Sequence, residues 1–314
     1  MLRFILSRIG QTIAVLFTVS VIIFALMRMI PGDPVLMMLG EDFTQDAYQR
    51  LRAQLGFDRS IVTQYLIWIG NILAGDFGDS YLNHERVSRL VFDAFLPTLS
   101  LVVASVIVGI LIAVPSGLIA AMRKDSAWDY GSMGFAIVVY SMPSFWKGII
   151  LIWIGSVYLG WFPAMGYVHP WTDFWPAMWR LALPALTLGT FFSGLVARII
   201  RSSLLDVLDQ DYIKAARAKG VRQAALVYKH ALANALIPVV TVIGLQFGAL
   251  LGGAVLTETV FSIPGMGRLT VSAILNRDYT VVQGTILVGV FAVVGVNLLV
   301  DLTYSFLNPK IRVT

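Results

Sequence analysis

The sequence predicts an all-α integral membrane protein with six transmembrane helices. Of its 314 residues, 58% are hydrophobic and only 13% are charged. Soluble globular chains have about 25% charged residues, so this chain lacks the charges needed to cover a surface that faces water. A helix needs about 20 apolar residues to cross a bilayer. Six segments meet this requirement: 9–29, 97–122, 131–159, 181–200, 235–256 and 283–307.

The first span is expected to remain in the mature protein. Two arginines, Arg3 and Arg8, precede a long apolar run, as basic residues do in a signal peptide. The apolar core of a signal peptide has about 7–15 residues and ends at a cleavage site of small residues. The run at 9–27 is longer, and the sequence MIPGDP at 29–34 is a poor cleavage site. We therefore expect an uncleaved membrane helix.

Lys and Arg in the short loops predict the orientation, because these residues gather on the cytoplasmic side of a membrane. With six spans, both termini lie on one side. That side holds the excess of basic residues: Arg3, Arg8, Arg123, Lys124, Arg201, Lys214, Arg217, Lys219, Arg222, Lys229, Lys310 and Arg312. The opposite short loops hold Arg180, Arg268 and Arg277. We expect both termini and the loop at 201–234 in the cytoplasm. The net charge of +5 has the same explanation, so nucleic-acid binding is not expected.

The segment at 31–96 is expected to be folded and to lie outside the cytoplasm. It starts as a turn, because the prolines of PGDP cannot continue a helix. Residues 44–55 have the pattern of an amphipathic helix capped by Thr44, and residues 61–73 predict a second helix rich in aromatic residues. The segment either rests on the outer leaflet or forms part of a docking surface for an external partner. Interfacial anchoring is expected of four tryptophans in the loop after the third span: Trp161, Trp171, Trp175 and Trp179.

The chain lacks the motifs of an enzyme. It has no phosphate-binding GxxxxGK[ST] sequence, no HExxH and no GxSxG. It has no cysteine, and its histidines, His84, His169 and His230, fall in separate loops on both sides of the membrane. Asp301 is the only carboxylate in the predicted spans, and intramembrane aspartyl chemistry needs two. We expect an interfacial or inter-helix role for Asp301, with no metal site and no catalysis.

Four polar residues within or beside the spans are candidates to line a passage. Gln246, Asn297, Ser141 and Lys147 would be costly to leave unpaired in lipid, so each is expected to face protein or water. The sequence leaves open whether they bond to neighbouring helices or line a pathway. Pro143 is expected to bend the third span, and bent helices suit a gated path.

A basic island in the loop at 201–234 is the most informative feature of the sequence. It reads DVLDQDYIKAARAKGVR at 206–222. A short helix is expected at 212–219, because Asp209 or Asp211 stands at its start and Gly220 stands where helices commonly end. The alanines within it offer a small surface that another protein can approach closely. The island is expected to dock a cytoplasmic partner, the alternative being contact with anionic lipid.

The island resembles the signature loop of one family, the permease subunits of ATP-binding-cassette importers. That signature is Glu-Ala-Ala, three further residues and Gly; this chain has KAARAKG at 214–220, with Lys214 in place of the Glu. The form DYIKAARAKG is typical of the dipeptide and oligopeptide branch, also called the peptide/nickel family. Further stretches are similar to that branch: MIPGDP at 29–34, SMPSFW at 141–146, LTETVFSIPGMGR at 256–268, RDYTVVQ at 277–283 and NPKIR at 308–312. The resemblance covers the whole chain.

This resemblance implies an architecture and a mechanism. The fold would be the type I importer permease fold, with a single membrane domain over residues 1–314 in a bacterial inner membrane. A second, similar permease would complete the pathway. Two ATPase subunits would use ATP and Mg, and an extracytoplasmic binding protein would deliver the substrate. The chain would bind no cofactor of its own, and its remaining partner would be membrane lipid.

The resemblance also implies the roles of particular residues. Those expected to contact an ATPase are Asp211, Tyr212, Ile213, Lys214, Ala215, Ala216, Arg217, Ala218, Lys219 and Gly220. Those expected to shape the outer mouth are Glu258, Pro264, Gly265 and Gly267. The implied cargo is a dipeptide or oligopeptide, with nickel, glutathione or opine as alternatives within the family; WFPAMGY at 161–167 is similar to the nickel branch. More distant alternatives are a membrane scaffold and a multi-span membrane enzyme.

Overall fold

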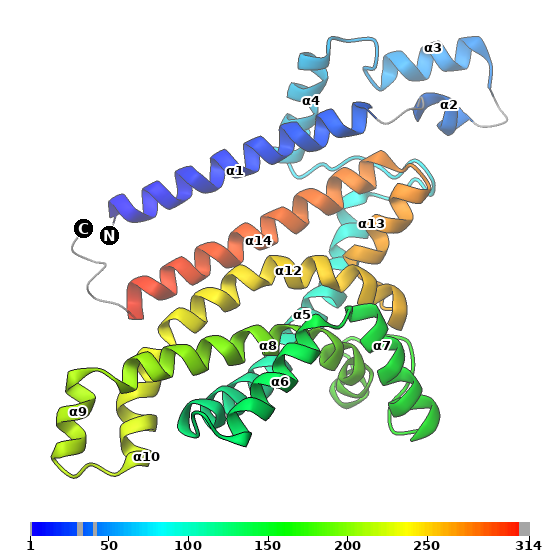
Figure 1. Ribbon diagram of the computed structural model, residues 1–314. Coiled ribbons are helices and arrows are strands. Elements are labelled where there is room, and N and C mark those ends of the chain that lie inside the picture. The colour runs from blue at the N-terminus through cyan, green and yellow to red at the C-terminus, as the bar shows by residue number, and fades with distance from the viewer. Residues whose placement is uncertain (1, 30–33, 40–42, 308–314) are drawn as a thin grey trace. The chain divides into compact units, whose positions relative to one another are not determined.

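Every regular element is a helix in the residues that the structure describes, which are 2–29, 34–39 and 43–307 of a computed structural model (Figure 1). The chain forms two compact units. The first unit contains Met1–Leu96 and Arg268–Val294, and the second contains Pro97–Gly267 and Gly295–Thr314. The prediction of a single domain is not tested by this division. The stretches MIPGDP and NPKIR lie largely outside the described residues, as does the side chain of Asp301.

In the described part of the chain, seven helices lie wholly or partly in the first unit: α1 (Leu2–Met29), α2 (Pro34–Leu39), α3 (Gln45–Gln54), α4 (Ile61–Leu73), α5 (Val87–Met122), α13 (Met266–Leu275) and α14 (Tyr279–Leu307). Helices α5, α13 and α14 continue across a boundary between the units. The remaining helices are α6 (Ala127–Ser141), α7 (Ser144–Ile152), η2 (Trp153–Tyr158), α8 (Phe174–Leu208), α9 (Asp211–Ala218), α10 (Gln223–Ala225), η3 (Leu226–Ala231), α11 (Leu232–Ala235) and α12 (Ile237–Phe261).

The membrane-spanning helices confirm the predicted class. Among the described residues, five helices are long and apolar enough to cross a membrane: α1, α5, α8, α12 and α14. A bent pair, Ala127–Ser141 with Ser144–Tyr158, makes six if it counts as one span. Helices α5 and α8 begin earlier than the predicted spans, at Val87 and Phe174, so the chain enters these helices before its most apolar stretch.

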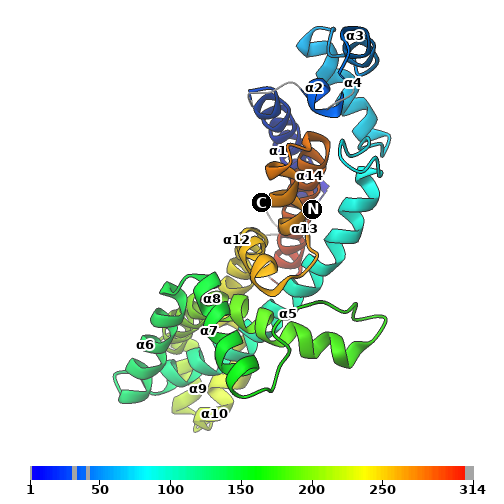
Figure 2. The same cartoon turned by 90° about the vertical axis from the view of Figure 1, so that its right-hand side faces the viewer.

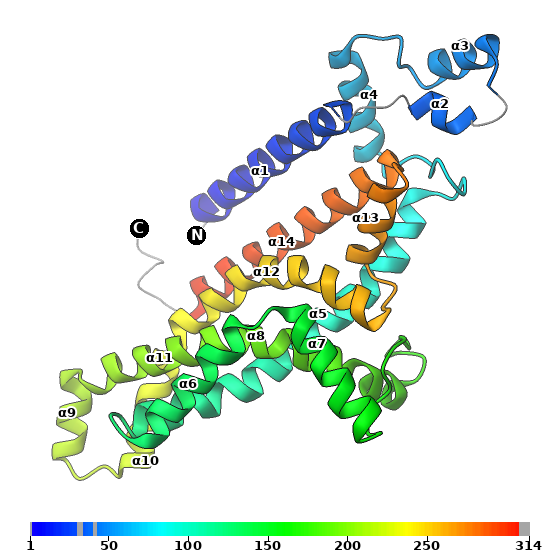
Figure 3. The ribbon, with the colours of Figure 1, turned by 45° about the vertical axis from the view of Figure 1, so that its right-hand side comes forward.

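The third predicted span is broken rather than gently bent. Helices α6 and α7 meet at an angle of 102°, and Figure 3 shows them running in different directions. Met142 is extended, with φ −74° and ψ 130°, because the ring of Pro143 disfavours a helical conformation in the residue before it. The sequence identified the proline, but a proline alone does not set how far the chain turns.

Helix α8 lies at the centre of the second unit and packs against α6, α7 and α12 (Figure 2). Its side chains Leu188, Phe192 and Ile200 are buried in the core cluster. Helix α5 also approaches closely, because a Cβ atom on Gly189 would lie 2.7 Å from the carbonyl oxygen of Ser105. A larger residue at 189 would separate the two helices, so this glycine is needed for close packing.

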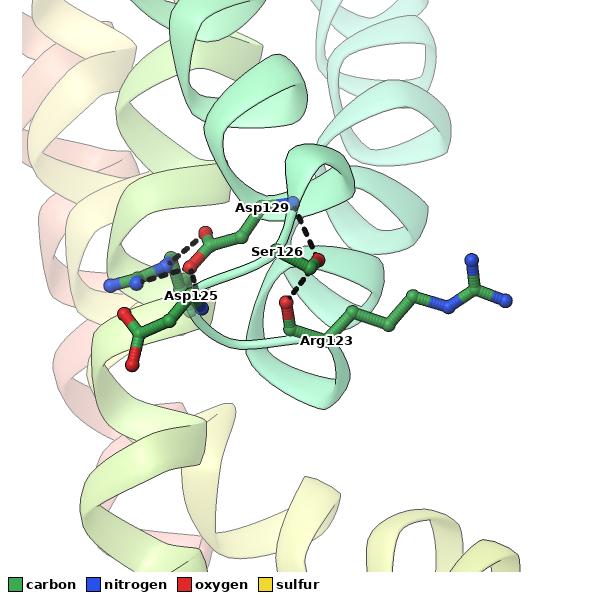
Figure 4. A network of polar contacts seen from close by, with 5 residues as sticks. Arg123, Asp125, Ser126 and Asp129 are labelled. Carbon is green, nitrogen blue, oxygen red and sulfur yellow. Dashed lines mark hydrogen bonds and ion pairs between the residues drawn. The ribbon is translucent and has the colours of Figure 1, made fainter.

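A buried ion pair joins α6 to α8. Arg201 was expected at the start of a cytoplasmic loop, but it lies within α8 and donates from Nε and Nη2 to the two carboxylate oxygens of Asp129, each at 2.6 Å. Figure 4 shows Asp129 facing this contact from the first turn of α6. Ser126 caps the same helix by accepting from the Asp129 N–H. Two planar groups paired in this way fix the separation and the rotation of both helices.

The first unit contains both helices predicted outside the membrane. The Thr44 side chain caps α3 by accepting a hydrogen bond from the Ala47 N–H, as expected. The Ser60 side chain caps α4 in the same way by accepting from the Thr63 N–H. Helix α4 packs on α1, where the hydroxyl groups of Ser20 and Tyr65 lie 2.8 Å apart. These contacts show that α3 and α4 form part of a folded unit with α1.

A buried hydrogen bond closes the first unit at the start of α14. The Ser80 hydroxyl donates to the Asp278 carboxylate at 2.5 Å, and Asp278 is only 2% exposed. The other carboxylate oxygen of Asp278 accepts from the Val281 N–H. Asp278 therefore caps α14 and fixes the loop that leads into α5.

Candidate functional site

The predicted helix of the basic island is present as α9. It begins after Gln210, with Asp211 in its first turn and Arg217 in its last turn, and both charges are favourable to the helix dipole. Gly220 has φ +81°. Its N–H donates to the Arg217 carbonyl, and the Val221 N–H donates to the Ala216 carbonyl. This is a Schellman ending, which a residue without a side chain adopts at low cost.

One side of α9 is fixed to the rest of the second unit. Ile213 is fully buried in a cluster with Leu204 of α8 and Leu226 of η3, and Ala216 packs against that cluster. The Tyr212 hydroxyl accepts from Nδ2 of Asn234 at 3.0 Å. Figure 1 shows α9 turned across the end of α8. Movement of α9 must therefore be passed to α8 and η3, because their side chains interlock.

The other side of α9 is exposed and mainly basic. Eight of the ten residues predicted to contact an ATPase are exposed: Asp211, Tyr212, Lys214, Ala215, Arg217, Ala218, Lys219 and Gly220. Nζ of Lys214 lies 2.9 Å from Oδ1 of Asp209. The hydrogen bond from Lys214 lowers the pKa of the Asp209 carboxyl, and the same bond raises the pKa of the Lys214 ammonium. Both groups stay charged at neutral pH, and Asp209 orients Lys214 at the beginning of the exposed face.

The four residues predicted at the outer mouth lie together in one turn. Helix α12 ends at Ser262, which has φ 55°, and the Ile263 N–H donates to the Glu258 carbonyl at 2.8 Å. Glu258 is fully buried, Gly265 lies against its carboxylate, and a Cβ atom on Gly267 would be 2.6 Å from Cα of Val255. Pro264 is exposed. The glycines are required because the turn has no space for side chains.

Thr98 completes this turn, and no pattern in the sequence indicates its role. Its hydroxyl donates to Oε1 of Glu258 at 2.5 Å and accepts from the Met266 N–H at 2.8 Å. Thr98 and Glu258 are separated by 160 positions. A threonine at the edge of an apolar span has no pattern that would pair it with a distant glutamate. The contact ties α5 to the turn after α12.

The four candidate pathway residues have different surroundings. Gln246 and Asn297 are half-buried, and Ser141 is exposed at the end of α6. Lys147 is buried; its Nζ donates to the Val139 carbonyl at 3.0 Å and to the Thr190 hydroxyl at 3.4 Å. No hydrogen bond or ion pair joins these four in the described part of the chain. The arrangement of Lys147 favours a packing role, while its place in a pathway stays a prediction.

The described residues contain no group of three or more His, Asp or Glu side chains that could hold a metal ion. The features with a defined geometry are therefore the exposed face of α9 and the turn after α12. The exposed face of α9 presents charged and small side chains. The turn after α12 is largely buried and connects α12 to α5 through hydrogen bonds. Neither arrangement offers a nucleophile beside a base.

The chain matches two family models. Residues 1–102 match the N-terminal part of the binding-protein-dependent transport system membrane component, and residues 113–313 match the binding-protein-dependent transport system inner membrane component. It is 42% identical to the di/tripeptide transport system permease protein DppB of Pseudomonas aeruginosa and 41% identical to the dipeptide transport system permease protein DppB of Escherichia coli K12. Each alignment covers 99% of both chains.

The fold is similar to that of a solved importer. Structures of the MetNI methionine ABC transporter in inward-facing conformations match with a TM-score of 0.59 and 20% identity, covering 70% of this chain and 96% of that chain. A crystal structure of an amino acid ABC transporter matches with a TM-score of 0.54. The chain therefore belongs to the family of binding-protein-dependent transport system inner membrane components, and it is the membrane-spanning permease of a bacterial ABC importer that works with ATPase and substrate-binding components.

Proposed function

We propose that this permease forms half of the translocation pathway for dipeptides or oligopeptides. The observation that carries the proposal is the full-length identity of 41–42% with permeases named for dipeptide and di/tripeptide transport. The form DYIKAARAKG at 211–220 favours the same cargo. Nickel, glutathione and opine are the competing cargoes, and none of them is favoured by the names of these relatives.

The complete importer contains four membrane-associated subunits and one external protein in this proposal. A second, homologous permease supplies the other half of the pathway. Two ATPase subunits bind ATP and Mg, and an extracytoplasmic binding protein delivers the peptide. The chain performs no catalysis, which is consistent with a sequence that has no phosphate-binding GxxxxGK[ST] loop.

Helix α9 is the contact with an ATPase in this mechanism. Its exposed face offers Ala215 and Ala218, which allow close approach, beside the cations of Lys214, Arg217 and Lys219. Ile213 does not touch the partner; it anchors the helix inside the permease. When the ATPases close on ATP, they push α9, and the buried cluster passes that displacement to α8 and η3.

Replacing a small exposed residue of α9 by a large one tests this assignment. Ala215→Trp is expected to reduce co-purification of the ATPases and to abolish peptide uptake, because the indole occupies the contact surface. Ala53→Trp, on exposed α3, is the matched control and should retain both properties. Ala216→Trp is a poorer choice because Ala216 packs inside the permease.

The outcomes separate the alternatives. Normal ATPase recovery and normal uptake for both Ala215→Trp and Ala218→Trp would contradict docking by α9. Uptake assays with labelled dipeptide, nickel and glutathione then decide the cargo. A membrane scaffold would bind ATPases without substrate-stimulated ATP hydrolysis, and a membrane enzyme would turn over substrate without them.

A further inference from the structure

The first unit contains a cavity to which the proposed mechanism assigns no role. Its volume is about 440 Å³, within the range of roughly 300–1,000 Å³ that is common for small-molecule sites. Its walls come from the end of α1, from α4, from the loop before α5 and from the start of α14. Because α1 ends and α14 begins at this cavity, it lies where membrane spans meet the aqueous phase.

Two cations in the cavity wall have neutral partners. The Arg28 guanidinium lies over the ring of Phe57 at 4.5 Å and over the ring of Phe24 at 5.1 Å. Arg52 donates to the Tyr48 hydroxyl at 2.8 Å. Within the described residues, no carboxylate lies within ion-pair distance of either guanidinium. These contacts orient the two arginines but leave their positive charge available to an anion.

Three buried polar atoms in the same wall make no hydrogen bond: the Tyr279 hydroxyl, Oε1 of Gln64 and the Thr280 hydroxyl. Tyr279 is 8% exposed, and its hydroxyl makes no hydrogen bond. Gln64 uses its Nε2 to donate to the Arg59 carbonyl at 2.7 Å, which leaves Oε1 buried and unbonded. Buried polar groups are nearly always paired. The cavity therefore lacks one group that can bond the Tyr279 hydroxyl and one donor for Gln64.

Much of the rest of the wall is aromatic, and it also contains one carboxylate, Asp76, whose Oδ1 accepts from the Gly78 N–H at 2.9 Å. Phe24, Trp68 and Phe77 line it, together with Tyr81. Burial raises the pKa of the Tyr81 phenol, so this group is a neutral hydroxyl at physiological pH. Flat apolar surfaces of this kind favour a ligand with an aromatic or aliphatic body.

We propose that this cavity binds a small organic anion whose carboxylate or phosphate meets Arg28 and Arg52, whose hydrogen-bond donor meets Gln64, and whose apolar body packs on the aromatic wall. The Tyr279 hydroxyl donates to the same anion. An acylated amino acid and the headgroup of an acidic phospholipid both present this chemistry. The cavity shares no lining residue with α9 or with the turn after α12.

The test measures binding without transport. The permease–ATPase complex is purified with the full chain, without the external binding protein and without ATP, and it is washed with detergent to remove lipid. Equilibrium dialysis with radiolabelled N-acetyl-phenylalanine should show saturable binding, whereas N-acetyl-phenylalaninamide should bind at least about tenfold more weakly because it has no charge. The acetyl group removes the free amine, so the probe does not mimic a peptide N-terminus.

Variants assign the binding to the cavity. Arg28→Gln and Arg52→Gln should each weaken binding of the acid by about tenfold or more, and Tyr279→Phe should weaken it by several-fold, because each loses a bond to the anion. Arg50→Gln removes a cation from the same helix as Arg52 but outside the cavity, and it should have no effect. Unchanged elution of each complex on gel filtration shows that the variants are folded.

Reconstitution separates the two sources of the anion. If binding persists in nanodiscs of phosphatidylcholine but disappears in nanodiscs of phosphatidylglycerol, the natural ligand is the lipid headgroup. If it persists in both, the ligand is a soluble anion. The proposal is overturned if the wild-type complex shows no saturable binding in detergent and in phosphatidylcholine, if the amide binds as well as the acid, or if Arg50→Gln weakens binding as much as Arg52→Gln.

Discussion

The Asp129–Arg201 pair is the clearest case of a single contact that fixes helix positions. Asp129 is almost fully buried, and both of its oxygens are occupied by the guanidinium. Removing one member of a buried pair is costly because the other charge is left without a partner. The distribution of basic residues included Arg201 among the cytoplasmic charges. It could not reveal that the Arg201 charge is neutralised by Asp129 within the protein.

Asp129→Asn is therefore expected to destabilise the permease by about 2–4 kcal/mol, because Arg201 remains charged without its carboxylate. Unfolding by titration with sodium dodecyl sulfate measures this free energy. The control is Asp93→Asn, which removes an exposed partner of Arg89 and should cost less than about 0.5 kcal/mol. The double variant Asp129→Leu with Arg201→Met should be more stable than Asp129→Asn; equal loss in all three variants would exclude the ion pair as the cause.

Contacts between residues that lie far apart along the chain could not be predicted from the sequence. The contact of Thr98 with Glu258, 160 positions away, and that of Lys147 with Thr190, 43 positions away, depend on how the helices pack. Apolar patterns place a helix in the membrane but do not fix its rotation or its neighbour. The family resemblance singled out the glycines of the turn after α12, whereas their structural reason, the buried Glu258 carboxylate beside Gly265, required the fold.

At the scale of elements, the helices with clear start and stop signals were predicted well. Thr44 and Gly220 mark ends that the structure has at the same places, because caps are local chemistry. Helix α4 has the predicted bounds Ile61–Leu73. The break between α6 and α7 was predicted only as a bend, since the angle depends on the contacts that α7 makes with α8 and α12.

Gly220→Ala should loosen the end of α9, because a Cβ atom at φ +81° is strained although no neighbouring atom lies within 4 Å. A cost of about 1 kcal/mol corresponds to roughly fivefold faster opening. Hydrogen exchange of the Gly220 and Val221 amides measures it. Gly220→Asn should show a smaller increase, since Asn tolerates this conformation better; equal rates in wild type and Gly220→Ala would show that the Schellman ending contributes nothing to the stability of α9.

At the scale of the whole molecule, the span count and the family resemblance were confirmed, while the orientation is still a prediction. Hydropathy works well here because a bilayer requires long helices with internally satisfied backbones. The division into two units was not foreseen. It separates the segment with α3 and α4 from the helices around α8, and its boundaries fall inside α5, α13 and α14 rather than in connecting loops.

The absence of cysteine allows the orientation to be measured directly. Single variants Asp58→Cys and Lys219→Cys place thiols at two exposed positions. A membrane-impermeant maleimide should label Asp58→Cys in intact spheroplasts and should label Lys219→Cys only after permeabilisation. Unmodified chain is the background control. The reverse pattern would place the basic island outside the cell and would remove any contact with a cytoplasmic ATPase.

The bond between Ser80 and Asp278 has a consequence for biosynthesis. Its two members are 198 positions apart, so the ribosome must complete most of the chain before the loop at Ser80 meets its partner. Tyr279 and Thr280, which follow Asp278, also form a wall of the cavity in the first unit. This unit therefore matures late, after most spans have been inserted. A nascent chain that stops before Asp278 lacks the partner of Ser80 and leaves this unit incomplete.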